Sequence, residues 1–167
     1  NENIILDGIN REFSLDLESL GDADKILENQ RYIRLQHLID SKFTDDKLSN
    51  ILSLISVRKD DEIQKLVTDN ADIPTIFEYV LGILWYKISN RKGKILDYMK
   101  LSLDADLLPK THAAGGEADI VYEYEKTSVY PAHSLLLEAT LADKTNQRRM
   151  EMEPVSRHLG NHILRTK

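Results

Sequence analysis

The stretch GGEADIVYEYE, residues 115–125, followed by HSLLLEATL, residues 133–141, says most about the fold of this chain. Apolar and polar side chains alternate within both segments, as they do in a β-strand that has two different faces. The short gap between the segments predicts an antiparallel hairpin. Gly115 and Gly116 are expected to turn the chain into the first strand, because they lack the Lys-Ser/Thr of a phosphate-binding loop.

Each of these predicted strands contains a carboxylate. Asp119 lies at the start of the first strand, and Glu138 interrupts a run of leucines in the second. An acid in such a position is costly unless it is paired, hydrogen-bonded or bound to a cation. A buried ion pair would explain a single acid. Two acids on neighbouring strands favour a divalent cation instead, since Mg²⁺ takes one or two carboxylates and leaves positions for water and phosphate oxygens.

Composition sets the outer limits. The chain has 167 residues, of which 41% are hydrophobic and 30% are charged, enough to bury the core of one domain or of a small domain plus part of another. It contains no cysteine, which excludes disulfides and thiolate zinc sites and agrees with a reducing cytoplasm. The apolar runs are too short to cross a bilayer, so we expect no membrane partner.

Charge is unevenly distributed along the chain. The net charge of -6 argues against a nucleic-acid partner when taken alone, because phosphates are neutralised by clustered Lys and Arg. Acids dominate up to about residue 70, whereas RKGK at 91–94 and the last 25 residues or so bring basic side chains to the second half. The first residue is Asn, so we expect a piece of a longer protein.

The first part of the chain reads as short helices. Residues 22–40 predict one helix with Asp22 or Asp24 as its N-cap, and its apolar side is expected to hold Ile26, Ile33 and Leu38. A second predicted helix follows Thr44 as N-cap, with apolar residues at helical spacing: Leu48, Ile51, Leu52 and Ile55. A third is expected to end at Asn70.

A longer helix is predicted to begin after Asp72, with Pro74 in its first turn, where the missing N–H costs nothing. Its broad apolar face is expected to contain Ile76, Phe77, Val80, Leu81, Leu84, Trp85 and Ile88. Glu78 lies at the edge of that face. Taken in isolation, Glu78 is explained as an exposed acid near the helix N-terminus, where the helix dipole favours it. The two strand acids shift the balance towards a functional role.

An acid at a strand start, followed on the next strand by an acid, one residue and a short polar side chain, resembles the core of the PD-(D/E)xK nucleases. The three segments GGEADIVYEYE, EATL at 138–141 and NQRRMEMEPVSRHLG at 146–160 resemble the cleavage domain of type IIS restriction endonucleases. The resemblance is to the AlwI family and its nicking relatives in particular. It is strongest from Gly115 to Gly160 and extends back to about Pro74.

The resemblance implies an α/β (α+β) fold with a PD-(D/E)xK restriction-endonuclease-like core. Residues 72–167 would be the N-terminal part of a nuclease catalytic domain. Residues 1–71 lie outside the resemblance, and their short predicted helices and position suggest a helical linker or winged-helix-like module. A helix is expected from Asn146 to about Arg165, bent or restarted near Pro154. Such a core usually continues with at least one further strand, so we expect it to be incomplete in this chain.

The resemblance also implies roles for individual residues. Asp119 and Glu138 would bind Mg²⁺ together with the Ala139 carbonyl, and Glu78 would be the acid on the preceding helix. Glu151 would be a fourth catalytic acid, with Glu153 as its competitor. Contacts to DNA phosphate, or support of the acids, would come from Gln147, Arg148, Arg157 and His158.

One position departs from the motif. The usual lysine two residues after the second acid is Thr140 here, so its role is either dispensed with or moved to Lys144, Gln147 or metal-bound solvent. His158 and His162 have the i, i+4 spacing of a zinc-binding helix, but no HExxH accompanies them and a phosphate contact is favoured.

The function implied is that of a bacterial, cytoplasmic, Mg²⁺-dependent type IIS restriction or nicking endonuclease. It would hydrolyse double-stranded DNA near an asymmetric site, and cutting both strands would need a second catalytic subunit or a transient dimer. The alternative from another class is a non-catalytic helical interaction or linker module whose acids form structural salt bridges.

Overall fold

The computed structural model describes residues 2–113, 117–142 and 144–166. For residues 144–151 it describes the backbone but not the side chains. The predicted turn at Gly115 and Gly116 therefore lies outside the described residues. The chain divides into two compact units, Asn1–Asp40 and Ser41–Lys167. The predicted boundary between residues 71 and 72, which separates a helical module from a catalytic domain, stays a prediction.

The first unit contains helix α1 (Glu2–Phe13) and most of helix α2 (Leu20–Lys42). The Asn10 side chain holds the connection between them, since it donates to the Leu17 carbonyl at 3.0 Å and accepts from the Leu17 N–H at 2.9 Å. The Ser19 hydroxyl precedes α2 and accepts from the backbone N–H of Asp22 at 3.2 Å. Ser19 is therefore the N-cap, and the predicted caps Asp22 and Asp24 are wrong.

The apolar side predicted for α2 is also wrong. Ile26 and Ile33 are 38% and 48% exposed, whereas the buried residues of the helix are Leu35 and Ile39. Apolar residues are sparse in this helix and occur on more than one side, so their spacing alone could not identify the buried face.

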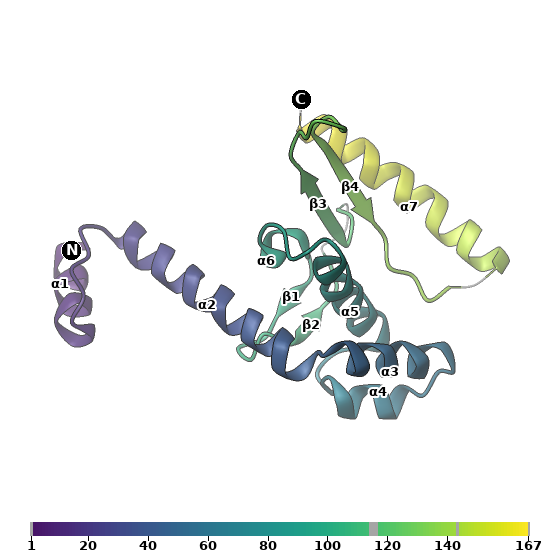
Figure 1. Ribbon diagram of the computed structural model, residues 1–167, viewed down its shortest axis with the longest axis horizontal. Coiled ribbons are helices and arrows are strands. Elements are labelled where there is room, and N and C mark those ends of the chain that lie inside the picture. The colour runs from purple at the N-terminus through teal and green to yellow at the C-terminus, as the bar shows by residue number, and fades with distance from the viewer. Residues whose placement is uncertain (1, 114–116, 143, 167) are drawn as a thin grey trace. The chain divides into compact units, whose positions relative to one another are not determined.

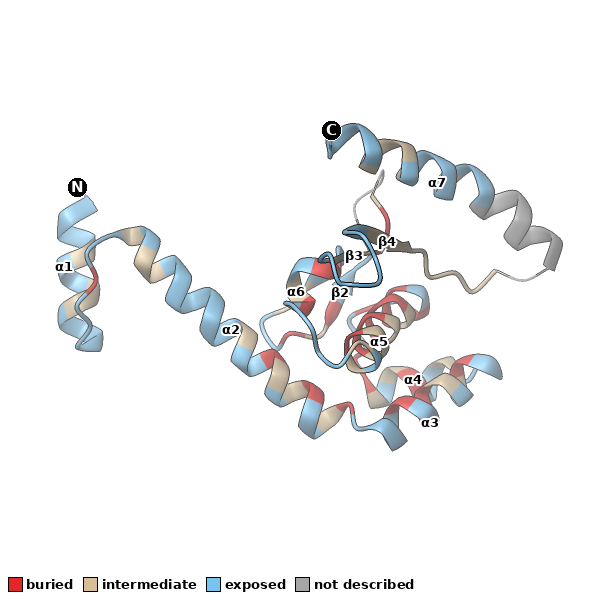
Figure 2. Ribbon diagram, turned by 45° about the horizontal axis from the view of Figure 1, so that its top comes forward, coloured by how far each residue is buried: buried red, intermediate tan, exposed pale blue. Residues whose placement is uncertain are grey.

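In the second unit, several elements contact one central helix. The helices are α3 (Asp45–Ser56), α4 (Asp60–Leu66), α5 (Ile73–Ile88), α6 (Ile95–Tyr98) and α7 (Lys144–Arg165), and α5 contacts α3, α4, α6 and strand β2 (Figure 1). Burial is concentrated along α5 (Figure 2). Phe43 and Tyr79, both fully buried, meet edge to face with ring centroids 5.4 Å apart.

The predicted helix starts of this unit are confirmed. The Thr44 side chain caps α3 by accepting from the Lys47 N–H, and the Asp72 side chain caps α5 by accepting from the Thr75 N–H at 3.0 Å. Leu48, Ile51 and Ile55 are buried as expected. The third predicted helix ends at Leu66 rather than Asn70.

The buried face of α5 differs from the predicted one. Ile88 is 72% exposed, and the buried residues are Ile73, Thr75, Ile76, Glu78, Tyr79, Val80, Gly82, Ile83 and Tyr86. This helix is apolar nearly all round, so periodicity constrains its orientation weakly. Compared with the predicted orientation, α5 is turned about its own axis, and this places Glu78 in the interior.

The sheets are small and antiparallel. Strands β1 (Ser102–Leu103) and β2 (Pro109–Thr111) pair with each other, as do β3 (Ile120–Tyr124) and β4 (His133–Leu137). The predicted hairpin is confirmed, with Ile120 opposite Leu137 and Tyr124 opposite His133. Both strands are shorter than predicted, so Asp119 and Glu138 flank the ladder. Helices with small antiparallel sheets belong to the α+β class.

Tyr122 fixes the hairpin against the helices. Its ring packs on Tyr98 of α6 with centroids 4.1 Å apart, and its hydroxyl lies 2.8 Å from both Ser89 Oγ and the Lys92 carbonyl oxygen. The predicted terminal helix is confirmed as α7, which runs through Pro154 as one element. In the described ranges, no helix has the length and apolar character needed to cross a bilayer.

Gly82 allows α5 to approach the segment beside β3. A Cβ at this position would lie 2.6 Å from Met99 Sδ. We expect Gly82→Ala to lower the free energy of unfolding by about 1–2 kcal/mol, because overpacking outweighs the gain in helix propensity. Gly160→Ala is the matched control, since a Cβ there meets nothing within 4 Å, and it should stabilise. Urea unfolding measures both, and a Gly82→Ala protein as stable as Gly160→Ala would contradict this packing.

Candidate active site

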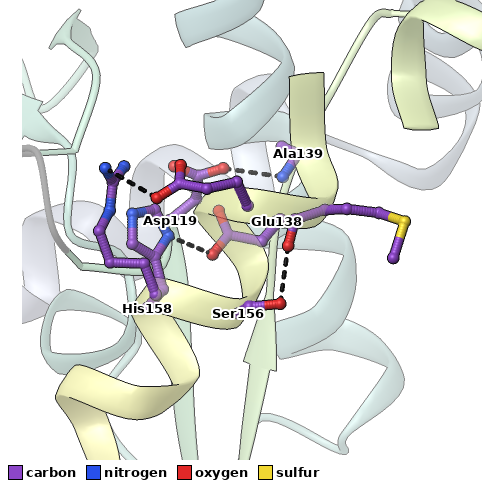
Figure 3. A network of polar contacts seen from close by, with 8 residues as sticks. Asp119, Glu138, Ala139, Ser156 and His158 are labelled. Atoms are coloured by element: carbon purple, nitrogen blue, oxygen red, sulfur yellow. Dashed lines mark hydrogen bonds and ion pairs between the residues drawn. The ribbon is translucent and has the colours of Figure 1, made fainter. Parts of the chain in front are cut away.

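Two carboxylates lie side by side at one end of the hairpin. Asp119 directly precedes β3 and Glu138 directly follows β4, and the register of the ladder, continued by one residue from Ile120 and Leu137, places them opposite each other. Opposite residues of an antiparallel pair project from the same face, with Cβ atoms about 5 Å apart. Figure 3 shows both side chains with their partners.

Asp119 is held from two sides. Its Oδ2 accepts a hydrogen bond of 2.7 Å from the backbone N–H of Ala139, and its own carbonyl accepts one of 3.0 Å from the N–H of Lys100 (Figure 3 shows the first). Hydrogen bonds from backbone N–H groups favour an ionised carboxylate. These two hydrogen bonds fix the position of Asp119 at the end of the sheet.

Glu138 is paired with helix α7. Its Oε1 lies 2.6 Å from Nδ1 of His158, and the two side chains are only 17% and 11% exposed. An ionised carboxylate can only accept, so Nδ1 carries the proton in this hydrogen bond. His158 thus supports an acid, one of the two roles that the sequence suggested for it, and its contact with DNA phosphate stays a prediction.

Glu78 comes to the same region from α5. It is 6% exposed, and its Oε2 accepts a hydrogen bond of 3.3 Å from the Ala113 N–H. The pKa of Glu78 is raised to about 7, chiefly by burial and then by the negative charge of Asp119, with smaller effects from Asp72 and Glu138. The interpretation of Glu78 as an exposed first-turn acid is therefore wrong. Glu78, Asp119 and Glu138 form an acid cluster.

The acid cluster contains carboxylate oxygens, the kind of ligand that Mg²⁺ prefers. Within the described residues, no group of three or more His, Asp or Glu side chains could enclose a metal ion. Mg²⁺ does not need such a cage, because one or two carboxylates with waters and substrate oxygens complete its coordination. Asp119, Glu138 and the Ala139 carbonyl supply hard oxygen donors of that kind, whereas Zn²⁺ prefers nitrogen and sulfur.

A cavity of about 190 Å³ opens between the hairpin and α7, and it includes His158, the partner of Glu138, but none of the three acids of the cluster. Charged side chains of both signs line it: Lys100, Glu117, Glu123, His158, His162 and Arg165. Arg165 forms an ion pair with Glu117. Sequence reasoning assigned no role to Lys100 or Glu117, and 48 residues separate Glu117 from Arg165, too far for a local pattern to reveal their pairing.

Other predicted site residues are not brought together in the described part of the structure. The side chains of Glu151, Gln147, Arg148 and Lys144 lie outside the described residues. Arg157 and Glu153 form an exposed ion pair of 3.4 Å along α7.

Thr140, at the position of the motif lysine, serves the local turn. Its Oγ1 accepts from the Ala142 N–H at 3.1 Å. The hydroxyl therefore has a structural hydrogen bond, and no positive charge stands at this position.

Comparison with known proteins gives one result. The model of the AlwI restriction endonuclease family matches residues 1–167, the entire chain. No curated protein and no solved structure matches the chain.

The raised pKa of Glu78 predicts a pH-dependent effect of Glu78→Gln on stability. Between its usual value of 4.5 and about 7, the folded protein holds a proton that the unfolded chain has lost, so wild-type stability falls as the pH rises through this window. Glu78→Gln should escape that loss and exceed wild type by roughly 2–3 kcal/mol at pH 8, with little difference below pH 4.5. Urea unfolding in EDTA measures this. Glu125→Gln, an exposed acid, is the control, and a pH-independent difference for Glu78→Gln would contradict the assignment.

Proposed function

Because the chain belongs to the AlwI restriction endonuclease family, a family of restriction nucleases that act on DNA, we propose that it hydrolyses phosphodiester bonds of double-stranded DNA at the acid cluster. The proposed cofactor is Mg²⁺. The proposed enzyme is of the type IIS class, which cuts or nicks beside an asymmetric recognition site. The observation that carries the proposal is the convergence of Glu78, Asp119 and Glu138 from one helix and two strands.

The charge of the acid cluster supports a cation. Three neighbouring carboxylates repel one another, and the pKa of Glu78 is raised in part by Asp119 and Glu138. They would also repel the phosphates of DNA. A divalent ion held by Asp119, Glu138 and the Ala139 carbonyl would neutralise this charge, polarise the phosphate and lower the pKa of a bound water.

Each residue of the cluster has a task that follows from its surroundings. The N–H of Ala139 and the backbone of Lys100 orient Asp119. His158 orients Glu138. Glu78 has a pKa of about 7, which suits a group that takes a proton from the attacking water near neutral pH.

The finer fold assignment is part of the proposal. A PD-(D/E)xK core presents its acids at the end of a hairpin, next to a helix that brings a further acid. The positions of Asp119, Glu138 and Glu78 are compatible with this arrangement, and α7 contacts the end of the hairpin through the pair of His158 with Glu138. The described residues contain one such cluster, so cutting both strands would take a second catalytic subunit or a transient dimer.

The non-catalytic alternative accounts for part of the geometry. The Glu138–His158 and Glu117–Arg165 pairs are what a structural salt-bridge module would contain. Such pairing lowers the pKa of an acid, however, whereas the pKa of Glu78 is raised, chiefly by burial and then by the charge of Asp119. A buried acid with a raised pKa beside two half-buried acids favours the catalytic proposal.

Asp119→Asn and Glu138→Gln should each abolish cleavage of plasmid DNA, because each removes an ionised oxygen donor while keeping the shape of the side chain. A loss of about 10³-fold or more is expected. Cleavage should also stop in excess EDTA and return with added Mg²⁺. Agarose gels of supercoiled, nicked and linear plasmid measure these outcomes.

Glu125→Gln is the matched control for both substitutions, since it removes an exposed acid just beyond β3. It should cut like wild type, and circular dichroism should show that all variants remain folded. Cleavage that continues unchanged in EDTA, or in folded Asp119→Asn, would contradict the proposal.

His158→Ala should lower the cleavage rate about 10–100-fold and raise the Mg²⁺ concentration required for half-maximal rate, because Glu138 loses the partner that orients it. His158→Gln, whose amide can still donate, should retain more activity. His133→Ala, at the opposite end of β4, is the control. A His158→Ala enzyme with the Mg²⁺ dependence of His133→Ala would show that the Glu138–His158 pair has no part in the reaction.

A further inference from the structure

Lys100 lies next to Asp119, on the side away from Glu138. Met99 forms a β-bridge with Ile120 on the edge of β3 that β4 leaves open, and the Lys100 N–H donates to the Asp119 carbonyl at 3.0 Å. Lys100 is therefore opposite Asp119 on one side, as Glu138 is on the other. The three residues form a row across the end of the sheet.

The side chains of this row project from one face. Met99 and Ile120 both lie against Gly82 of α5, so they occupy the face that packs on the helices. Neighbouring residues of an extended segment alternate, which puts Lys100 and Asp119 on the opposite face. The cavity agrees with this placement for Lys100, which lines it together with Val121, Leu136 and His158, and His158 is bonded to Glu138.

Lys100 is also the cation best able to take a new partner. Arg165 and His158 in the same cavity already face carboxylates, Glu117 and Glu138. The ammonium group of Lys100 donates to the neutral Asp97 carbonyl at 2.8 Å, and the residue is exposed. A phosphate oxygen is a stronger acceptor than a neutral carbonyl, because the hydrogen bond is then between two charged groups.

We propose that Lys100 contacts the phosphate of the substrate beside the acid cluster and supplies the positive charge that is missing at Thr140. The inference rests on the proposed function, and it adds the residue that stabilises the reacting group. Lys100 would leave the Asp97 carbonyl and donate to a non-bridging phosphate oxygen. It transfers no proton. Its positive charge stabilises the negative charge that develops on the phosphate oxygens during hydrolysis.

The test uses Lys100→Gln with Lys65→Gln as the matched control, since Lys65 is an exposed lysine on α4. Two quantities are measured. The first is the single-turnover cleavage rate of a DNA duplex with Mg²⁺. The second is the salt dependence of duplex binding with Ca²⁺ in place of Mg²⁺, followed by fluorescence anisotropy.

Lys100→Gln should lower the rate about 10²–10³-fold and reduce the slope of log affinity against log salt by about one, as the loss of one phosphate contact requires. Lys100→Arg should restore the slope. Lys65→Gln should change neither. A folded Lys100→Gln enzyme that matches Lys65→Gln in both measurements would overturn the inference while leaving the proposed function intact.

The two proposals fail in different ways. If wild type binds DNA but does not cut it, the proposed function is contradicted, and the binding slope still decides whether Lys100 contacts phosphate. If wild type neither binds nor cuts, both proposals are overturned.

Discussion

The repulsion among three carboxylates is the constraint on which this site depends. Glu78 is buried on α5, and Asp119 and Glu138 are neighbours across the end of the hairpin. Folding buries Glu78 and brings the other two acids near it, and both effects, burial first, raise its pKa. A fold that served stability alone would keep these carboxylates apart or pair each of them with a basic side chain. Their convergence is explained if they bind a cation that in turn binds a phosphate group of the substrate.

The surrounding structure offsets part of this repulsion with hydrogen bonds. Backbone N–H groups of Ala113 and Ala139 donate to Glu78 and Asp119, and His158 pairs with Glu138. These donors come from a loop, from the end of β4 and from α7, so three separate segments of the second unit hold the cluster. Gly82 and Tyr122 contribute at a distance, because they set how closely the hairpin and its neighbouring segment pack on the helices.

Local chemistry made some features predictable from the sequence. The caps Thr44 and Asp72, the hairpin and the family were inferred from side-chain type, alternation and motif, and all four are confirmed. The buried face of α5 was not predictable, because that helix is apolar on nearly all sides. The short strands β1 and β2 exist through pairing with each other rather than through any signal of their own. The pairing of His158 with Glu138 joins residues 20 positions apart. The β-bridge between Met99 and Ile120, which places Lys100 next to Asp119, has no motif in the sequence that predicts it.

The pKa of the Glu78 carboxyl, followed by NMR with and without Mg²⁺, tests most directly whether the three acids share a cation. The account predicts a value of about 7 in the absence of the ion and a clear fall when Mg²⁺ is added, because a nearby cation favours the charged form. A value that is near 4.5 without the ion, or that Mg²⁺ leaves unchanged, would contradict it.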